Sequence, residues 1–217
     1  VAYMSMKYDP VLYDLDPRPF LKEEVDFYIN LVNTFKPKSI LELGVGTGRI
    51  LSRLLPMTDW AVGIDISESM LKRCKEVCGQ YSNFKLYKMN FVDFDLKMTF
   101  HMIYLPFNTF QHLLTEEDQI RCLRSVRKHM SIDSRFILDV MSGDCFPSTL
   151  DEWREDYLND LPNGNAIRRE QKTLEIDRKA SVVHKKFKYS EVEGGNVKNY
   201  KEFDALMRIT PNDRMLE

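Results

Sequence analysis

Three glycines stand at every second position of the stretch LELGVGTGRI, at Gly44, Gly46 and Gly48. They follow an apolar run that begins at Ser39 and is typical of a buried strand. In a parallel sheet, ligands bind beyond the carboxyl ends of the strands, and glycines there let a ligand approach the backbone and the start of the next helix. The stretch therefore predicts a nucleotide-type binding loop.

The spacing of the glycines narrows the choice of ligand. The dinucleotide fingerprint has two residues between its second and third glycine, whereas this loop has one. A phosphate-binding P-loop needs Gly-Lys followed by Ser or Thr, and here Arg49 follows the last glycine. Both patterns are disfavoured, although an NAD-dependent oxidoreductase stays open as an alternative.

Two acids flank the loop. Glu42 lies inside the apolar strand, where a carboxyl group costs free energy unless it is paired, so we expect a polar or cationic partner for it. Asp65 ends the next expected strand, about twenty residues beyond the loop, where an acid accepts hydrogen bonds from both hydroxyls of an adenosine ribose. The glycines and both acids are expected to converge on one crevice.

Alternating strands and helices position these residues. Strands are expected over residues 39–43, 60–67, 83–96, 100–107 and 134–141. Helices are expected over 21–35, 50–55, 67–79 and 115–130, with Ser67 and Thr115 as N-caps. Such alternation predicts an α/β fold with a doubly wound, mostly parallel sheet of Rossmann type.

The pattern changes after Gly143. We expect one short helix over Leu150–Leu158 and then strands over Ala166–Ile176, Ser181–Val192 and Val197–Ile209. The sequence EGGN between the last two strands is a hairpin turn signal. An antiparallel elaboration is therefore predicted after the fifth core strand.

We expect a single domain over residues 1–217, with a helical lid at 1–36, a cofactor-binding core at 37–142 and a substrate-side elaboration at 143–217. Hydrophobic residues at 43% and charged residues at 29% are ordinary for a globular protein. A net charge of −2 predicts no general attraction to nucleic acid, and no apolar run is long enough to cross a membrane. We therefore expect a cytoplasmic protein with a small-molecule partner.

Four cysteines are present without any CxxC spacing. Cys74 and Cys78 stand four apart in a helical pattern, and free thiols are the favoured interpretation. A zinc site from these two and a distant histidine is the alternative, and no metal is expected.

The order of three motifs resembles the class I S-adenosylmethionine-dependent methyltransferases. LELGVGTGRI, GIDISESML and MNFVDFDL follow one another as in that family, and the match runs from about Lys38 to Met141. The resemblance implies a Rossmann-like methyltransferase core with S-adenosyl-L-methionine as cofactor. It also implies that the glycine loop supports the methionine part, that Glu42 lies near it, and that Asp65 holds the ribose hydroxyls.

Further residues complete the cofactor-binding set that the resemblance implies. Ile66 and Met70 flank adenine, and Phe91 and Leu105 belong to the same set. In the family, the third strand usually ends with an aspartate that meets the adenine amino group. Asn90 stands at that place, and its amide oxygen can also accept a hydrogen bond.

The stretches FNTFQHL and YDPVLYD are similar to small-molecule N-methyltransferases, including those that methylate amino sugars and glycine. In the amino-sugar group a histidine and a tyrosine at the matching positions lie at the acceptor, which makes His112 and Tyr13 the catalytic candidates. With a pKa near ~6.5, His112 could take a proton from an ammonium acceptor or orient it. Alternatively, His112 caps a short turn, and Tyr13 and Tyr8 pack an N-terminal helix.

The expected function is methyl transfer to a small molecule, at an amine nitrogen or, next, at oxygen. The alternative from another class is a catalytically reduced S-adenosylmethionine-binding or interaction protein. Asp139, which ends the fifth strand, is expected either to line the acceptor pocket or to partner a helix cap.

The end of the chain departs from the family pattern. Family members usually add a helix and two strands after the fifth strand, whereas this chain ends at Glu217. We expect those core strands to be missing and the fifth strand to be a sheet edge, which the elaboration or a second copy in a homodimer would cover.

Overall fold

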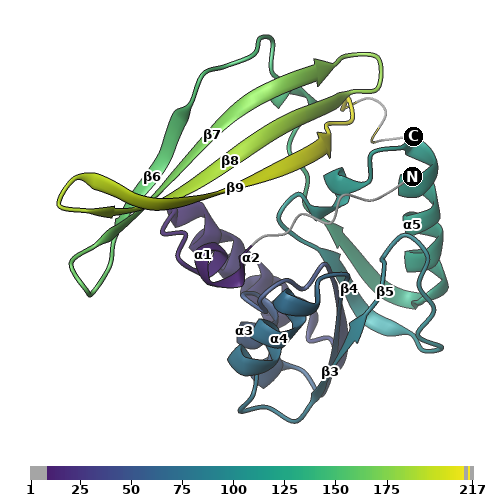
Figure 1. Cartoon of the computed structure of the whole chain (residues 1–217). Coiled ribbons are helices and arrows are strands. Elements are labelled where there is room, and N and C mark those ends of the chain that lie inside the picture. Colours follow the sequence, from purple (N-terminus) through teal and green to yellow (C-terminus); the bar gives the residue numbers. More distant parts are fainter. Residues whose placement is uncertain (1–8, 213–214, 216–217) are drawn as a thin grey trace. The chain divides into compact units, whose positions relative to one another are not determined.

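The computed structural model describes residues 9–212 and residue 215. Two compact units make it up: residues 19–140, and residues 9–18 together with 141–212 and 215. Each unit is built on its own sheet, parallel in the first and antiparallel in the second (Figure 1).

Five parallel strands form the sheet of the 19–140 unit. They are β1 (Ser39–Leu43), β2 (Trp60–Asp65), β3 (Phe84–Lys88), β4 (Phe100–Leu105) and β5 (Met130–Leu138). Their order is β3-β2-β1-β4-β5, and every neighbouring pair is parallel. The order reverses between β1 and β4, and ligands of such sheets bind at that switch point. The predicted doubly wound sheet is confirmed.

Four α-helices accompany these strands, one before β1 and three between successive strands. They are α2 (Pro19–Phe35), α3 (Leu51–Leu54), α4 (Glu68–Val77) and α5 (Glu116–Lys128), with the 3₁₀ turns η1 (Leu55–Met57) and η2 (Thr109–His112) between them. The predicted N-caps are both present, because the side chain of Ser67 accepts from Met70 N–H and that of Thr115 accepts from Asp118 N–H.

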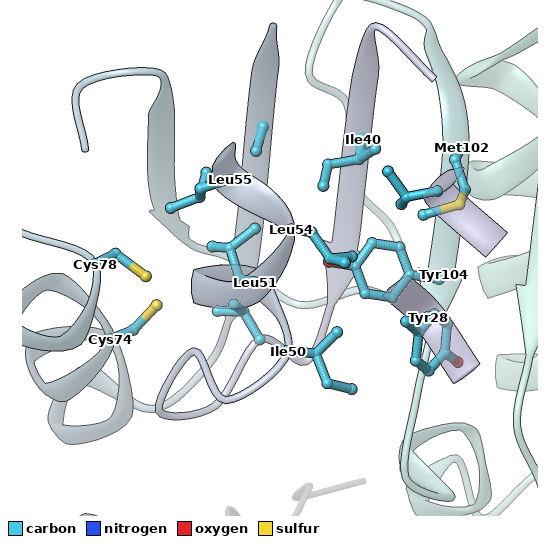
Figure 2. Packing of buried hydrophobic residues seen from close by; sticks show 13 residues of the cluster. Tyr28, Ile40, Ile50, Leu51, Leu54, Leu55, Cys74, Cys78, Met102 and Tyr104 are labelled. Atoms are coloured by element: carbon cyan, nitrogen blue, oxygen red, sulfur yellow. The ribbon is translucent and has the colours of Figure 1, made fainter. Parts of the chain in front are cut away.

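Buried apolar side chains cover both faces of the parallel sheet. On one face, residues of α2, α3 and α4 pack against Ile40, Met102 and Tyr104 (Figure 2). The neighbouring strand residues Leu41 and Ile103 point to the opposite face, since side chains alternate along a strand, and they are fully buried too. The sheet is therefore enclosed on both sides, as near-continuous apolar strands predict.

The third strand is shorter than expected. The sequence predicts a strand over 83–96, but β3 ends at Lys88. The Asn90 side chain accepts a hydrogen bond from Val92 N–H at 2.9 Å, a local turn that competes with an extended backbone.

The second unit is a four-stranded antiparallel sheet with a short helix, α1 (Pro10–Asp14), and a 3₁₀ turn, η3 (Gly143–Cys145). Its strands, in the order β6-β7-β8-β9, are β6 (Arg154–Asp160), β7 (Ala166–Asp177), β8 (Val182–Glu193) and β9 (Asn196–Arg208). The turn at EGGN is confirmed, and Gly194 and Gly195 have φ of 56° and 83° there.

One element of this unit is wrong in the sequence prediction. The expected helix over Leu150–Leu158 is absent, and β6 occupies most of that stretch. Pairing with β7 decides this, since Asp156 of β6 forms a buried ion pair with Arg169 of β7. The local sequence pattern of residues 150–158 fits a helix as well as a strand, and the contacts between the strands decide the outcome.

The three-part division of a single domain stays a prediction. In the structure, α2 groups with the parallel sheet, and residues 9–18 group with the antiparallel sheet. Strand β5 is an edge of the five-stranded sheet, as expected. No helix of the described ranges is both long and apolar enough to cross a membrane.

Candidate functional site

The glycine loop connects β1 to α3 through a left-handed backbone. Gly44, Gly46 and Gly48 have φ of 72°, 54° and 83°, values that residues with a side chain rarely adopt. The N–H groups of Gly44 and Val45 donate to the Ile64 carbonyl at 2.8 and 3.0 Å, which ties the loop to β2. The loop therefore requires glycine for its backbone conformation.

The three glycines differ in the space around them. A Cβ at position 44 would lie 2.5 Å from Thr109 Cγ2, and one at position 48 would lie 2.7 Å from Cys74 Sγ. Nothing lies within 4 Å of the corresponding point at Gly46. The middle of the loop is thus the place where a ligand can approach the backbone.

Asp65 accepts two backbone hydrogen bonds at the end of β2. Gly46 N–H donates to Oδ2 at 2.9 Å, and Ser67 N–H donates to Oδ1 at 2.8 Å. Burial raises the pKa of this carboxyl above its ordinary value, and the backbone donors oppose that effect. Asp65 thus fixes the loop and the start of α4, and each oxygen keeps a lone pair for a ligand hydroxyl.

Glu42 is almost completely buried in β1, with 2% of its surface exposed. Its expected polar partner is Tyr104 of β4, whose hydroxyl donates to Oε2 at 2.9 Å. Burial raises the pKa of Glu42 to about 8, although the Tyr104 hydrogen bond lowers it. Glu42 therefore holds its proton at neutral pH.

A buried hydroxyl in the loop escaped the sequence analysis. Thr47 is 1% exposed, and its Oγ1 has no hydrogen-bond partner among the described residues. A buried hydroxyl normally pairs, so Thr47 and the open space at Gly46 together fit a polar ligand against this loop. Its position between two loop glycines was the signal that could have found it.

The residues expected around adenine lie on the β2 and β3 side. Ile66 is 38% exposed directly after β2, and Met70 is buried on α4. The Asn90 amide oxygen accepts a hydrogen bond from Val92 N–H and keeps one lone pair for a ligand. Phe91 is the next residue in the chain. Leu105 is fully buried at the end of β4, so its side chain belongs to the sheet interior.

The loop after β4 contains a strained backbone. Phe107 and Asn108 have φ of 54° and 57°, which is an outlier for a residue as bulky as phenylalanine. Phe107 N–H donates to Glu24 Oε1 of α2 at 2.8 Å, and its ring stacks on Phe20 with centroids 6.3 Å apart. The Arg49 guanidinium lies 5.3 Å from the same ring. Strain that is held in this way clusters at functional sites.

Sequence reasoning also missed the groups that support this loop. Arg49 forms an ion pair with Glu24 and donates to the Leu21 carbonyl at 2.8 Å. Burial raises the pKa of Glu24 above its ordinary value, the carboxyl of Asp139 after β5 adds to that effect, and Arg49 opposes it. These interactions connect the glycine loop, α2 and the residues after β5, and no local sequence pattern predicts them.

The two catalytic candidates lie in different units. His112 ends η2 in the 19–140 unit, and Tyr13 lies on α1 in the other unit. Both side chains are partly buried. Their roles therefore stay predictions, and Tyr8 lies outside the described residues.

The cysteines form no metal centre in the part of the chain that the structure describes, where no group of three or more His, Cys, Asp or Glu side chains is placed to hold an ion. Cys74 of α4 and Cys78, which follows the last residue of α4, are buried free thiols next to the glycine loop, and Figure 2 shows their sulfur atoms side by side.

Comparison with known proteins gives a family match for the central part of the chain. Residues 40–132 match the family described as Methyltransferase domain. Phosphoethanolamine N-methyltransferase 1 of Arabidopsis thaliana is 27% identical over 119 residues, which is 55% of this chain and 23% of that protein. The Triticum aestivum phosphoethanolamine N-methyltransferase is 33% identical over 79 residues, 36% of this chain and 15% of that protein. The chain spans less than a quarter of the length of these relatives.

Solved structures share the fold over most of the chain. A sugar N-methyltransferase of Streptoalloteichus has a TM-score of 0.73 at 16% identity and covers 89% of this chain and 75% of its own. An amino pentose methyltransferase of Micromonospora echinaspora with bound S-adenosylmethionine has a TM-score of 0.75 at 15% identity, with coverage of 94% and 83%. At such identities the likeness concerns the fold alone.

Proposed function

We propose that this chain, whose residues 40–132 match a methyltransferase domain, transfers a methyl group from S-adenosyl-L-methionine to a small-molecule acceptor, at an amine nitrogen. The proposal goes beyond the domain match because it names a cofactor site, an acceptor class and the residues that serve them.

The observation that carries the proposal is the arrangement of Asp65 and Gly46. The carboxylate at the end of β2 holds the loop amide at 2.9 Å, and the loop is open at the same glycine. A ligand with a ribose diol and a polar tail fits this combination, since the diol needs acceptors such as Asp65 and the tail can lie against the open backbone at Gly46. The unpaired Thr47 hydroxyl supports the tail assignment.

The remaining cofactor residues follow from their places in the fold. Gly44 and Gly48 shape the loop, the protonated Glu42 supports it from β1, and Ile66 with Met70 packs beside adenine. Asn90, Phe91 and Leu105 belong to this proposal with less support, because Asn90 already accepts a local hydrogen bond and Leu105 is fully buried.

Methyl transfer requires few protein side chains beyond those that align the acceptor with the cofactor. When bound, S-adenosylmethionine supplies both the methyl group and the sulfur leaving group. The loop and Asp65 hold the cofactor, and the acceptor side aligns the attacking atom and excludes water. His112 and Tyr13 are proposed to orient the acceptor there.

An amine acceptor agrees with what the relatives are named for. The curated relatives are phosphoethanolamine N-methyltransferases, and the structural neighbours include sugar and amino pentose methyltransferases. Phosphorylated amino alcohols and amino sugars share a small alkylamine. We propose small alkylamines as the acceptor class of this chain and name no individual acceptor.

Replacing Asp65 tests the cofactor site. We expect Asp65→Ala to weaken S-adenosylhomocysteine binding by at least about tenfold in calorimetry, because it removes both the ribose acceptor and the Gly46 anchor. Asp59→Ala is the matched control, since this exposed acid precedes β2 at its other end.

Methyl transfer itself is tested with methyl-labelled cofactor and a panel of small amines. Labelled product formed by the wild type, and lost in Asp65→Ala, supports the enzyme. Tight S-adenosylhomocysteine binding without any labelled product would instead favour a non-catalytic binding protein. Equal binding by wild type and Asp65→Ala would mean that the cofactor site is misplaced.

Two further expectations stay proposals. A second copy is proposed to cover the β5 edge, and a mass measurement by light scattering in solution tests it. The cytoplasm is proposed as the location, and imaging of the tagged protein in cells tests it.

A further inference from the structure

Glu24 of α2 contacts both loops of the candidate site. Its Oε1 accepts from Phe107 N–H at 2.8 Å, in the loop after β4, and its Oε2 forms an ion pair with Arg49, which directly follows the last loop glycine. The Glu24 side chain is only 9% exposed, so solvent screens these contacts little. One carboxylate of α2 therefore connects the glycine loop to the loop after β4.

The two loops also contact each other directly. Thr109 lies against Gly44, since a Cβ at position 44 would lie 2.5 Å from Thr109 Cγ2. Thr109 begins the turn η2 and His112 ends it. All these residues belong to the 19–140 unit. The turn that contains the proposed acceptor residue is therefore in contact with the loop that is proposed to bind the cofactor.

The backbone that leads into η2 has an unfavourable conformation. Phe107 and Asn108 both have left-handed φ values, 54° and 57°. Residues with a side chain adopt such values only where surrounding contacts hold them there, and bulky residues do so least often. At Phe107 these contacts are the Glu24 carboxylate and the stacked ring of Phe20. Without the hydrogen bond to Glu24, we expect the backbone to relax toward an ordinary conformation and to displace η2.

We propose that Glu24 is a positioning residue for methyl transfer. It holds η2 in the arrangement that presents His112 to the acceptor, and it connects that arrangement to the cofactor loop through Arg49. The proposal rests on the proposed function and concerns how its two binding sites are linked. Because the two partners of Glu24 belong to different loops, a ligand that fixes the glycine loop also stabilises the Phe107–Glu24 hydrogen bond.

The consequence is positive coupling between cofactor and acceptor. Molecules with a relaxed turn do not bind the acceptor, so they lower its apparent affinity, and cofactor binding reduces their number. Linkage makes the effect reciprocal, so a bound acceptor strengthens cofactor binding by the same factor. The acceptor then binds preferentially to enzyme that already holds the cofactor.

Hydrogen exchange of the Phe107 amide tests the role of Glu24 before any ligand is added. Glu24→Leu removes both contacts of the carboxylate, and we expect exchange at Phe107 to become at least about tenfold faster. Glu24→Gln keeps an oxygen that can accept from Phe107 N–H, so exchange should stay within about threefold of the wild type. Glu23→Gln is the matched control, the same change at the exposed neighbour in α2, and should leave exchange unaltered.

The Phe100 amide separates a local effect from a general loss of stability. It donates to the His129 carbonyl at 2.9 Å at the start of β4, in the same unit. A variant that destabilises the whole unit speeds exchange at Phe100 as well as at Phe107. Loss of the Glu24 contact alone is expected to speed exchange at Phe107 and to leave Phe100 unchanged. Thermal unfolding establishes that each variant is folded.

Saturating S-adenosylhomocysteine then tests the link to the cofactor loop. In the wild type, we expect it to slow exchange at Phe107 by at least about fivefold and to shift the ring signals of His112 in nitrogen-15 spectra. Glu24→Gln and Arg49→Met both break the ion pair but keep an acceptor for Phe107 N–H. In these variants we expect the slowing to be less than about twofold, with binding confirmed by calorimetry.

The outcomes separate this inference from the proposed function. If the wild type fails to bind S-adenosylhomocysteine, the proposed function is wrong, and exchange without ligand still decides whether Glu24 holds the turn. If the ligand binds but slows exchange at Phe107 equally in the wild type, Glu24→Gln and Arg49→Met, or in none of them, Glu24 does not link the two sites and only the inference falls. Unchanged exchange at Phe107 in folded Glu24→Leu would overturn it as well.

Discussion

At the scale of single residues, the sequence predicted the acids next to the glycine loop, Glu42 and Asp65, but not Glu24, the acid of α2 that contacts this loop. Glu42 and Asp65 stand at fixed distances from the glycines, so spacing alone assigned them a place. Glu24 forms an ion pair with Arg49 and accepts from Phe107 N–H at 2.8 Å, so its place depends on how α2 packs beside two loops that are distant in sequence.

Glu42 offers a prediction about stability and pH. Its carboxyl has a pKa of about 8 when folded, against an ordinary 4.5. Between these values the unfolded chain has lost a proton that the folded chain keeps, so this residue lowers the free energy of unfolding as pH rises. We expect Glu42→Gln to remove that loss and to gain a few kcal/mol over the wild type at pH 8, measured by urea denaturation.

The comparison needs a matched change outside the sheet. Glu117→Gln alters an exposed glutamate at the start of α5, and its stability is expected to follow the wild-type pH dependence. Parallel wild-type and Glu42→Gln curves from pH 5 to 8 would show that Glu42 ionises as easily in the folded protein as in the unfolded chain.

At the scale of elements, two glycines of the loop have different roles, although the sequence gives no sign of a difference between them. Gly46 faces open space, whereas Gly48 packs against the thiols of α4. Both have a left-handed backbone, which costs about 1–2 kcal/mol for a residue with a Cβ.

Alanine at each position is expected to act differently. Gly48→Ala adds a clash with Cys74 Sγ at 2.7 Å, so it should lose more stability than Gly46→Ala. Gly46→Ala places its methyl group where the ligand approaches, so it should lose more affinity for S-adenosylhomocysteine. Thermal unfolding and calorimetry of both variants provide the two measurements, and the reverse ranking in either would contradict the assignment of the open space.

At the scale of the whole molecule, every residue proposed to bind the cofactor lies in the 19–140 unit. A ligand that binds only the folded state stabilises it by about 2.7 kcal/mol at a hundred times its dissociation constant. For a protein of this size, that corresponds to a rise in melting temperature of roughly 5–10 °C.

A thermal-shift comparison uses this effect to test the cofactor. S-adenosylhomocysteine is expected to raise the transition that reports unfolding of the 19–140 unit, and NADH at the same concentration is expected to leave it unchanged. A larger shift with NADH would favour the oxidoreductase alternative, and no shift with either ligand would leave the glycine loop without a nucleotide.

The sequence by itself determined the parallel sheet, the glycine loop, its two acids and the EGGN hairpin. Each depends on local periodicity, on turn chemistry or on short spacings, which a linear chain displays directly. The tertiary structure decided β6, the proton on Glu42 and the Glu24–Arg49 ion pair. These depend on pairing between strands, on burial and on the approach of distant side chains, because tertiary packing overrules local preference and sets the environment of each carboxyl.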